Sequence, residues 1–193
     1  MIEGILDTKV KMRIAKLFAE RNEALQVSDV ARILKISKSR ASVCLKELAK
    51  KGILESKEVG RSVIYKSSST ALARSVSETL LQEKVLLFEI EKEVVKCIKK
   101  FKPISLALFG SALKGLKVGS DIDFIFIYDG KIEKEKIYEI SSELSVRFGF
   151  HISILTMSLG ELKEKAKKGE EFVLNILATS KILYGKPLEG LIW

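Results

Sequence analysis

The 193-residue chain is poor in the side chains that build metal centres and cross-links. It has one histidine, His151, and two cysteines, Cys44 and Cys97, which stand far apart in the sequence. Structural zinc sites use four Cys or His ligands, so the composition excludes a zinc site of that type. Both cysteines fall in helical patterns, and we expect them to be buried, reduced thiols.

Long apolar runs are also missing. No stretch approaches the roughly 18 consecutive apolar residues of a membrane span, which predicts a protein without a membrane partner. The first residues lack a basic segment followed by an apolar run, so no signal peptide is expected and the predicted location is cytoplasmic. A hydrophobic content of 47% is enough to fill the core of one large domain or of two small ones.

Positive charge is unevenly distributed along the chain. Residues 1–68 hold 15 Lys and Arg against 8 Asp and Glu, which gives +7 of the total net charge of +9. A local excess of this kind indicates a polyanionic partner for the first third of the chain. The chain has 27 Lys to 7 Arg, with two Asn and two Gln, a composition that favours a heat-adapted (thermophile) source.

The first third has the pattern of a winged helix-turn-helix. Apolar spacing predicts a helix over 9–21, a second from the N-cap pair Ser28-Asp29 to Leu34, and a third from Ser37 or Ser39 to about Lys50. The inward face of the third helix includes either Val43 or Cys44. Two alternating segments around Gly60 predict a hairpin, the wing of this fold.

In such a fold the first turns of the third helix reach base edges in the major groove. The residues expected to contact double-stranded DNA are Lys38, Ser39, Arg40, Ser42 and Lys46 on this helix and Lys57, Arg61 and Lys66 on the wing. Arg40 can offer two donors to guanine, whereas lysines contact phosphates. The alternative is a protein-interaction module whose charges form a solvated face. The segment resembles the winged-helix repressors of bacteria and archaea, which implies a transcriptional regulator.

A polar run at residues 67–70 marks a boundary and is followed by a long helical pattern from Ala71 to about Lys100. Positions seven apart in this pattern are apolar: Leu80, Leu87, Val94 and Phe101. They form either the seam of a homodimer or the buried face of a helix packed on its own chain. The predicted organisation is a DNA-binding domain at 1–68, a linking helix at 69–100 and a second domain at 101–193.

The second domain alternates strands and helices. Strands are expected at 104–109, 124–128 and 150–156, and helices at 134–148, 159–168 and 170–179, with a short segment at 182–185. This order predicts a mixed α/β sheet with helices on its faces. The fold class of the whole chain is therefore α+β with two domains.

Gly110 and Ser111 follow the first strand of this domain, and a loop then leads to Asp121 and Asp123. Two carboxylates two residues apart on a strand point to the same face, and such oxygen ligands suit Mg²⁺. Backbone N–H groups at a Gly-Ser turn, with the serine hydroxyl, can hold a triphosphate.

This constellation resembles the nucleotidyltransferase superfamily that includes DNA polymerase β, and within it the minimal nucleotidyltransferases, from Phe101 to Gly185. The resemblance implies that Asp121 and Asp123 are catalytic metal ligands. It further implies a nucleotide-binding set of Gly110, Ser111, Lys114 and Ser120. Lys114 stands where the family commonly has arginine.

The family's third acidic residue lies on the strand after the intervening helix, where this chain has no carboxylate. We expect His151 in its place, with Ser153 next on the same face. An imidazole can act as a base but binds Mg²⁺ less well than a carboxylate does.

Three functions remain open from the sequence. The favoured one is a dimeric transcriptional regulator whose degenerate nucleotidyltransferase domain senses a nucleoside triphosphate with Mg²⁺. The second is an active Mg²⁺-dependent nucleotidyltransferase that modifies a partner protein or a small molecule and regulates its own gene. The third is an interaction scaffold that binds neither DNA nor nucleotide.

Overall fold

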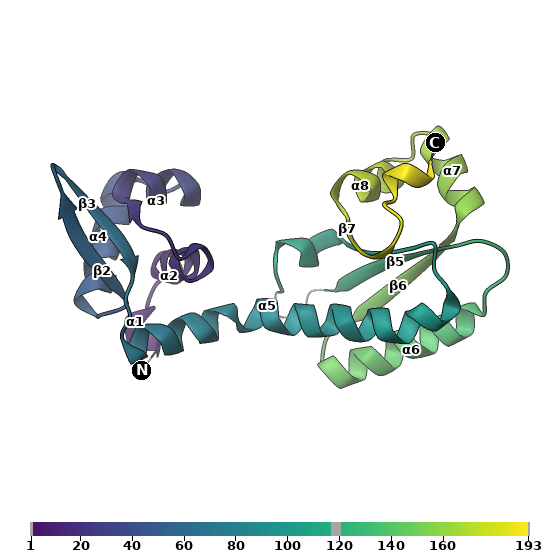
Figure 1. Cartoon of the computed structure of the whole chain (residues 1–193), viewed down its shortest axis with the longest axis horizontal. Coiled ribbons are helices and arrows are strands. Elements are labelled where there is room, and N and C mark those ends of the chain that lie inside the picture. Colours follow the sequence, from purple (N-terminus) through teal and green to yellow (C-terminus); the bar gives the residue numbers. More distant parts are fainter. Residues whose placement is uncertain (1, 117–120, 193) are drawn as a thin grey trace. The chain divides into compact units, whose positions relative to one another are not determined.

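The computed structural model describes residues 2–116 and 121–192 (Figure 1). The chain divides into two compact units, Met1–Gln82 and Glu83–Trp193. Ser120, one of the predicted nucleotide contacts, lies outside the described residues.

The first unit is a three-helix domain with a wing. Its elements are α1 (Ile2–Ile5), α2 (Lys9–Arg21), β1 (Leu25–Gln26), α3 (Val27–Leu34), α4 (Lys38–Lys50), β2 (Leu54–Val59) and β3 (Ser62–Ser67). The antiparallel strands lie in the order β1-β3-β2. Ile14 and Phe18 of α2 and Leu45 and Leu48 of α4 are almost fully buried in its core. The winged helix-turn-helix predicted from the sequence is confirmed.

Helix starts in this unit follow from side-chain caps. The Ser37 hydroxyl accepts a hydrogen bond from the Arg40 backbone N–H (3.3 Å) and begins α4, one of the two predicted alternatives. The predicted cap of α3 was wrong, because α3 begins at Val27 with Gln26 as its N-cap. Asp29 instead lies in the first turn, where its carboxylate accepts from the Gln26 backbone N–H at 3.2 Å.

The long helix α5 (Ala71–Ile98) contributes to both cores. Leu72, Val76 and Leu80 pack in the first unit, and Ile90 and Val94 pack in the second. Leu87 and Phe101, from the same heptad positions as Leu80 and Val94, also pack on the second core. The predicted seam is therefore packed on its own chain, which is the second of the two alternatives.

The second unit is a four-stranded sheet with helices on both faces. Its further elements are η1 (Lys99–Phe101), β4 (Ser105–Phe109), η2 (Gly110–Lys114), β5 (Ile122–Tyr128), α6 (Lys134–Phe148), β6 (Ile152–Ser158), α7 (Leu159–Lys167), α8 (Glu171–Thr179), β7 (Lys181–Gly185) and η3 (Glu189–Leu191). The strand order is β6-β5-β4-β7, with β5 and β6 parallel and the other pairs antiparallel. This mixed sheet confirms the predicted α+β class.

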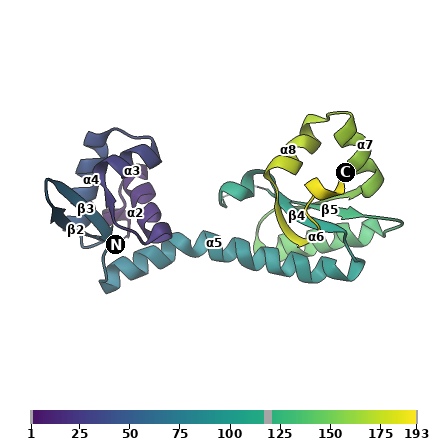
Figure 2. The ribbon, with the colours of Figure 1, turned by 45° about the horizontal axis from the view of Figure 1, so that its top comes forward.

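Alternation along β5 assigns each helix layer to a face of this sheet. Phe124 and Phe126 belong to a core shared with α5 and α6, whereas Ile125 and Ile127 belong to a core shared with α7 and α8. Figure 2 shows α6 and α8 on opposite sides of the strands. Odd-numbered residues of β5 therefore face the α8 side.

No helix in the described part of the chain is both long enough and apolar enough for a bilayer crossing. Cys44 is buried and Cys97 is partly buried. Burial raises the pKa of the Cys44 thiol, which disfavours the reactive thiolate.

Candidate nucleic-acid interface and nucleotide site

Helix α4 presents a polar, basic outer face. Its inward side chains are Ala41, Cys44, Leu45 and Leu48. The predicted DNA contacts Lys38, Ser39, Arg40 and Lys46 are exposed, while Ser42 is half-buried. The sequence left Val43 and Cys44 as alternatives for the core, and the structure buries Cys44 and leaves Val43 56% exposed.

The wing carries a second set of basic side chains. Lys57 of β2 and Arg61 at the turn are both exposed. Lys66 of β3 is exposed too, but its Nζ lies 3.1 Å from Glu55 Oε2, so part of its charge is neutralised within the wing. Of the three predicted wing contacts, Lys66 is therefore the one whose charge is already paired by a carboxylate.

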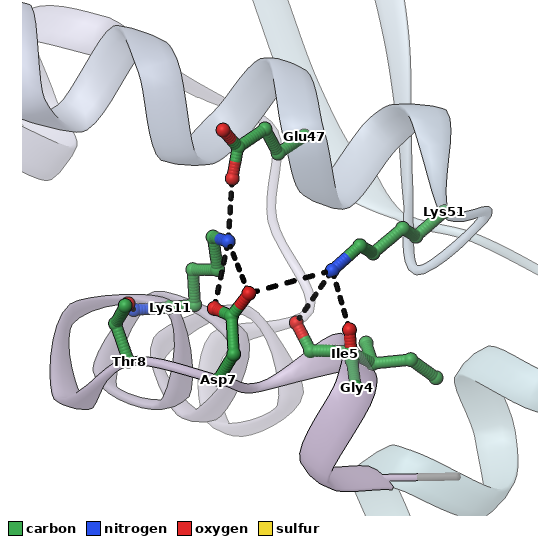
Figure 3. A network of polar contacts seen from close by, with 7 residues as sticks. All are labelled: Gly4, Ile5, Asp7, Thr8, Lys11, Glu47 and Lys51. Atoms are coloured by element: carbon green, nitrogen blue, oxygen red, sulfur yellow. Dashed lines mark hydrogen bonds and ion pairs between the residues drawn. The ribbon is translucent and has the colours of Figure 1, made fainter.

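A network of ion pairs ties α4 to the N-terminal helices (Figure 3). The Lys11 side chain is only 8% exposed, and its Nζ lies 2.7 Å from Asp7 Oδ1 and 2.5 Å from Glu47 Oε2. Lys51 donates to the Gly4 carbonyl oxygen at 2.6 Å. The Lys11 ammonium lowers the pKa of Asp7, and the carboxylates of Asp7 and Glu47 raise the pKa of Lys11. Sequence reasoning missed this network, although the spacing of Asp7 and Lys11 is that of a helical ion pair.

In the second unit, two carboxylates meet at the start of β5. Asp123 lies opposite Phe109 of β4 and Ser153 of β6, on the sheet face covered by α8. Asp121 precedes the strand and its side chain is 60% exposed. Burial and the nearby Asp121 carboxylate raise the pKa of Asp123, although His151 acts in the opposite direction. A cation at this position would relieve the repulsion between the two carboxylates.

The start of β6 contributes two residues to this site, and neither of them has a carboxylate. Strand register places Ser153 beside Asp123. His151 lies just before β6, with its Nδ1 3.1 Å from Asp121 Oδ1. Within residues 2–116 and 121–192, no group of three or more His, Cys, Asp or Glu side chains is arranged to hold a metal ion. Asp121 and Asp123 are therefore the two carboxylates that this arrangement brings together.

The turn after β4 brings the backbone against Asp123. Gly110 has φ +77°, and a Cβ atom at this position would lie 2.9 Å from Asp123 Oδ2. Only glycine accommodates both the left-handed backbone and this close approach. The Ser111 hydroxyl donates to the Asp121 carbonyl oxygen at 3.4 Å, which links the turn to the start of β5. Lys114, the other described residue of the predicted nucleotide set, is exposed at the end of η2.

A pocket of about 490 Å³ lies between this turn and α8. Its lining residues are Phe109, Gly110, Ser111, Leu113, Lys114, Phe172, Asn175, Ile176 and Thr179. The half-exposed Phe172 ring packs edge-on against Phe109, with ring centroids 5.9 Å apart. The volume and the mixed lining suit a small organic ligand such as a nucleoside. Sequence reasoning missed the α8 residues, for which the only signal was an aromatic side chain on an exposed helix face.

Comparison with known families assigns both halves of the chain. The family described as polymerase beta, nucleotidyltransferase, matches residues 91–188, slightly more than half of the chain. The chain belongs to the polymerase beta nucleotidyltransferase family. The IclR helix-turn-helix domain matches residues 12–58. The protein is therefore a helix-turn-helix DNA-binding domain fused to a nucleotidyltransferase domain, as the sequence patterns predicted.

Solved structures also match parts of this nucleotidyltransferase chain at low identity. Reduced HlyU from Vibrio cholerae is 21% identical, with a TM-score of 0.37, over 42% of this chain and 82% of that chain. The Shewanella oneidensis HEPN toxin in complex with MNT antitoxin is 15% identical, with a TM-score of 0.36, over 53% of this chain and 77% of that chain. A toxin–antitoxin structure with AMP-PNP is 17% identical, with a TM-score of 0.40, over 53% and 80%. Comparison with curated proteins finds no match.

Proposed function

We propose that the protein is a transcriptional regulator whose nucleotidyltransferase domain binds a nucleoside triphosphate with Mg²⁺ and acts as a sensor. The observation that carries this proposal is the pairing of Asp123 with Ser153. The two aspartates and the Gly110-Ser111 turn proposed to hold metal and phosphates stand close together, whereas the place beside Asp123 holds a hydroxyl and no carboxylate. This arrangement supports nucleotide binding without a carboxylate general base beside Asp123.

For DNA, we propose that α4 enters the major groove and that the wing contacts the backbone. Arg40 would donate to a guanine edge, and Ser39 and Ser42 would contact phosphates or bases. Lys38, Lys46, Lys57 and Arg61 would supply salt-dependent phosphate contacts. The exposed face of α4 and the local charge of the first third support this assignment.

For the nucleotide, we propose that the base lies in the pocket beside α8. Phe172 offers an aromatic surface for stacking, and the Asn175 amide offers both a donor and an acceptor for a base edge. The backbone of Gly110 and Ser111 would hold the phosphates, with Lys114 and Ser120 as further contacts. Asp121 and Asp123 would hold Mg²⁺, which supplies charge neutralisation for the triphosphate when it is bound.

For the response, we propose that nucleotide binding alters DNA affinity through α5, in a homodimer of this chain. The helix is continuous from Ala71 to Ile98, and its side chains belong to the core of both units. A rearrangement of the second core can therefore act on the same helix that carries Leu72, Val76 and Leu80 of the first core. Reciprocity requires that bound DNA change nucleotide affinity by the same factor.

A second function is favoured by one contact. His151 Nδ1 lies 3.1 Å from Asp121 Oδ1, so an imidazole stands beside a proposed metal ligand. If His151 takes the proton of an acceptor hydroxyl on a partner protein or small molecule, that oxygen bonds to the α-phosphorus of the triphosphate and pyrophosphate leaves. Transfer of label from a nucleotide to an acceptor, lost in Asp123→Ala and in His151→Ala, would establish this function in place of the sensor.

Calorimetric titration of nucleoside triphosphates into the full chain with Mg²⁺ tests the sensor site. We expect one triphosphate to bind, and the double variant Asp121→Asn, Asp123→Asn to lose that binding. Asp129→Asn, a change of the same chemistry in an exposed turn after β5, serves as the matched control and should bind normally. Absence of binding for every triphosphate would contradict the proposal.

A further inference from the structure

Helix α4 carries one large apolar side chain on its otherwise polar outer face. Val43 is 56% exposed, whereas its neighbours Cys44 and Leu45 are buried. Among the described residues, the core of the first unit gathers apolar side chains from all of its helices, and Val43 is not one of them. Val43 therefore belongs to the outer surface of α4 and not to the core of the first unit.

Neither folding nor solubility favours valine at this position. A β-branched residue on an exposed helix face is a poorer helix former than alanine, lysine or arginine. The stripe to which Val43 belongs contains Ser39 one turn before it and Lys46 one turn after it, and both suit solvent or DNA. The exposed part of this apolar side chain is removed from water only when a partner covers it.

The major groove offers one apolar group on base edges, the C5 methyl group of thymine. We propose that Val43 is a specificity-determining residue that reads a thymine methyl group in the major groove. This inference rests on the proposed DNA binding through α4 and adds a second base position to the one assigned to Arg40.

Spacing along α4 sets the distance between the two bases. Val43 follows Arg40 by three residues, about 4.5 Å along a helix axis. Successive bases of one strand are about 3.4 Å apart along the duplex. The thymine therefore lies one or two base pairs from the guanine. The Ser37 cap on the Arg40 N–H fixes the start of α4, and the ion pair with Lys11 neutralises the nearby Glu47 carboxylate.

Thymine-to-uracil replacement tests the inference, because it removes the methyl group and nothing else. The full chain is first used to select its tightest duplex from a randomised pool, and affinity is measured by fluorescence anisotropy. Each thymine of the selected duplex is then replaced by deoxyuridine in turn. We expect one thymine near a guanine to lose roughly fourfold in affinity, the value for one buried methyl group.

Variants assign this effect to Val43. Val43→Ala should bind the thymine and uracil duplexes with affinities within about twofold of each other. Val146→Ala, a matched change at an exposed position of α6, should keep the full wild-type response to uracil. Thermal melting checks that Val43→Ala is folded, which is expected because the side chain lies outside the core.

Two results would overturn the inference. One is a wild-type protein that responds to no uracil replacement, and the other is a Val43→Ala variant that responds as strongly as wild type does. Failure to retain any duplex from the pool would instead overturn the proposed DNA binding, so the two failures are distinguishable.

Discussion

Substitution of Gly110 by alanine is the sharpest perturbation of the proposed nucleotide site. An alanine at φ +77° costs about 1–2 kcal/mol because its Cβ atom crowds the following carbonyl oxygen. The new Cβ atom would also meet Asp123 Oδ2 at 2.9 Å, so the carboxylate must move by a few tenths of an ångström. The first effect lowers stability, and the second displaces a proposed metal ligand.

Gly130→Ala separates these two effects. Gly130 has φ +80°, but nothing lies within 4 Å of a Cβ atom built there. We expect both variants to lose about 1–2 kcal/mol of unfolding free energy in urea titrations. Only Gly110→Ala should weaken triphosphate binding in the presence of Mg²⁺, by roughly tenfold or more, the cost of about 1.4 kcal/mol at the site. Equal nucleotide affinities for the two variants would refute the assignment of this turn.

Three further expectations concern the DNA-binding face and the ion pairs. Lys46→Ala should weaken duplex binding at low salt and reduce the slope of log affinity against log salt by about 0.9, as measured by anisotropy. Lys181→Met should lower the free energy of unfolding measured in urea by about 1–2 kcal/mol. The reason is that the almost fully buried Glu91 carboxylate loses the Lys181 ammonium, whose Nζ lies 2.7 Å from Glu91 Oε2. A further Glu91→Leu change should recover stability. Lys11 lowers the pKa of Asp7, so the contribution of Asp7 to stability is present above its ordinary pKa and is lost as pH falls through its lowered value. Asp7→Asn should remove this part of the acid-induced loss in circular dichroism titrations, and an unchanged pH profile would contradict that cause.

Local patterns were enough to predict most helices. The spacing of Val10, Ile14 and Phe18 predicts a helix over 9–21, and α2 has those bounds. Prediction failed where two neighbouring residues could each form a helix cap or each face the core. The start of α3 depends on the reciprocal position of Gln26 and Asp29, and helical spacing alone cannot choose between Val43 and Cys44.

The site was predictable only where it is local in sequence. Asp121, Asp123 and Gly110 lie in a short strand–turn pattern whose chemistry can be read directly. The residue beside Asp123 depends on the register between β5 and β6. Helix α6 separates these two strands along the chain, so local sequence patterns do not determine that register. Strand β6 was expected to begin at Phe150 but begins at Ile152. The chain leaves α6 through the left-handed turn at Gly149, and ladder pairing with β5 starts only at Ile122 and Ile152.

The α8 side of the pocket and the Lys11 network were beyond sequence reasoning for the same reason. Phe172, Asn175 and Thr179 reach the Gly110 turn only because α8 folds over the sheet. Glu47 reaches Lys11 only because α4 packs on α2. Contacts of this kind depend on tertiary packing, which periodicity does not encode.

The most direct test of the central claim is the affinity of the full chain for its selected DNA duplex with and without saturating triphosphate and Mg²⁺. The account predicts a change of roughly fivefold or more in the wild-type protein. The double variant Asp121→Asn, Asp123→Asn should show no change, although it binds DNA as the wild type does without nucleotide. Equal wild-type affinities, under conditions where calorimetry shows the nucleotide site to be full, would contradict a nucleotide-sensing regulator.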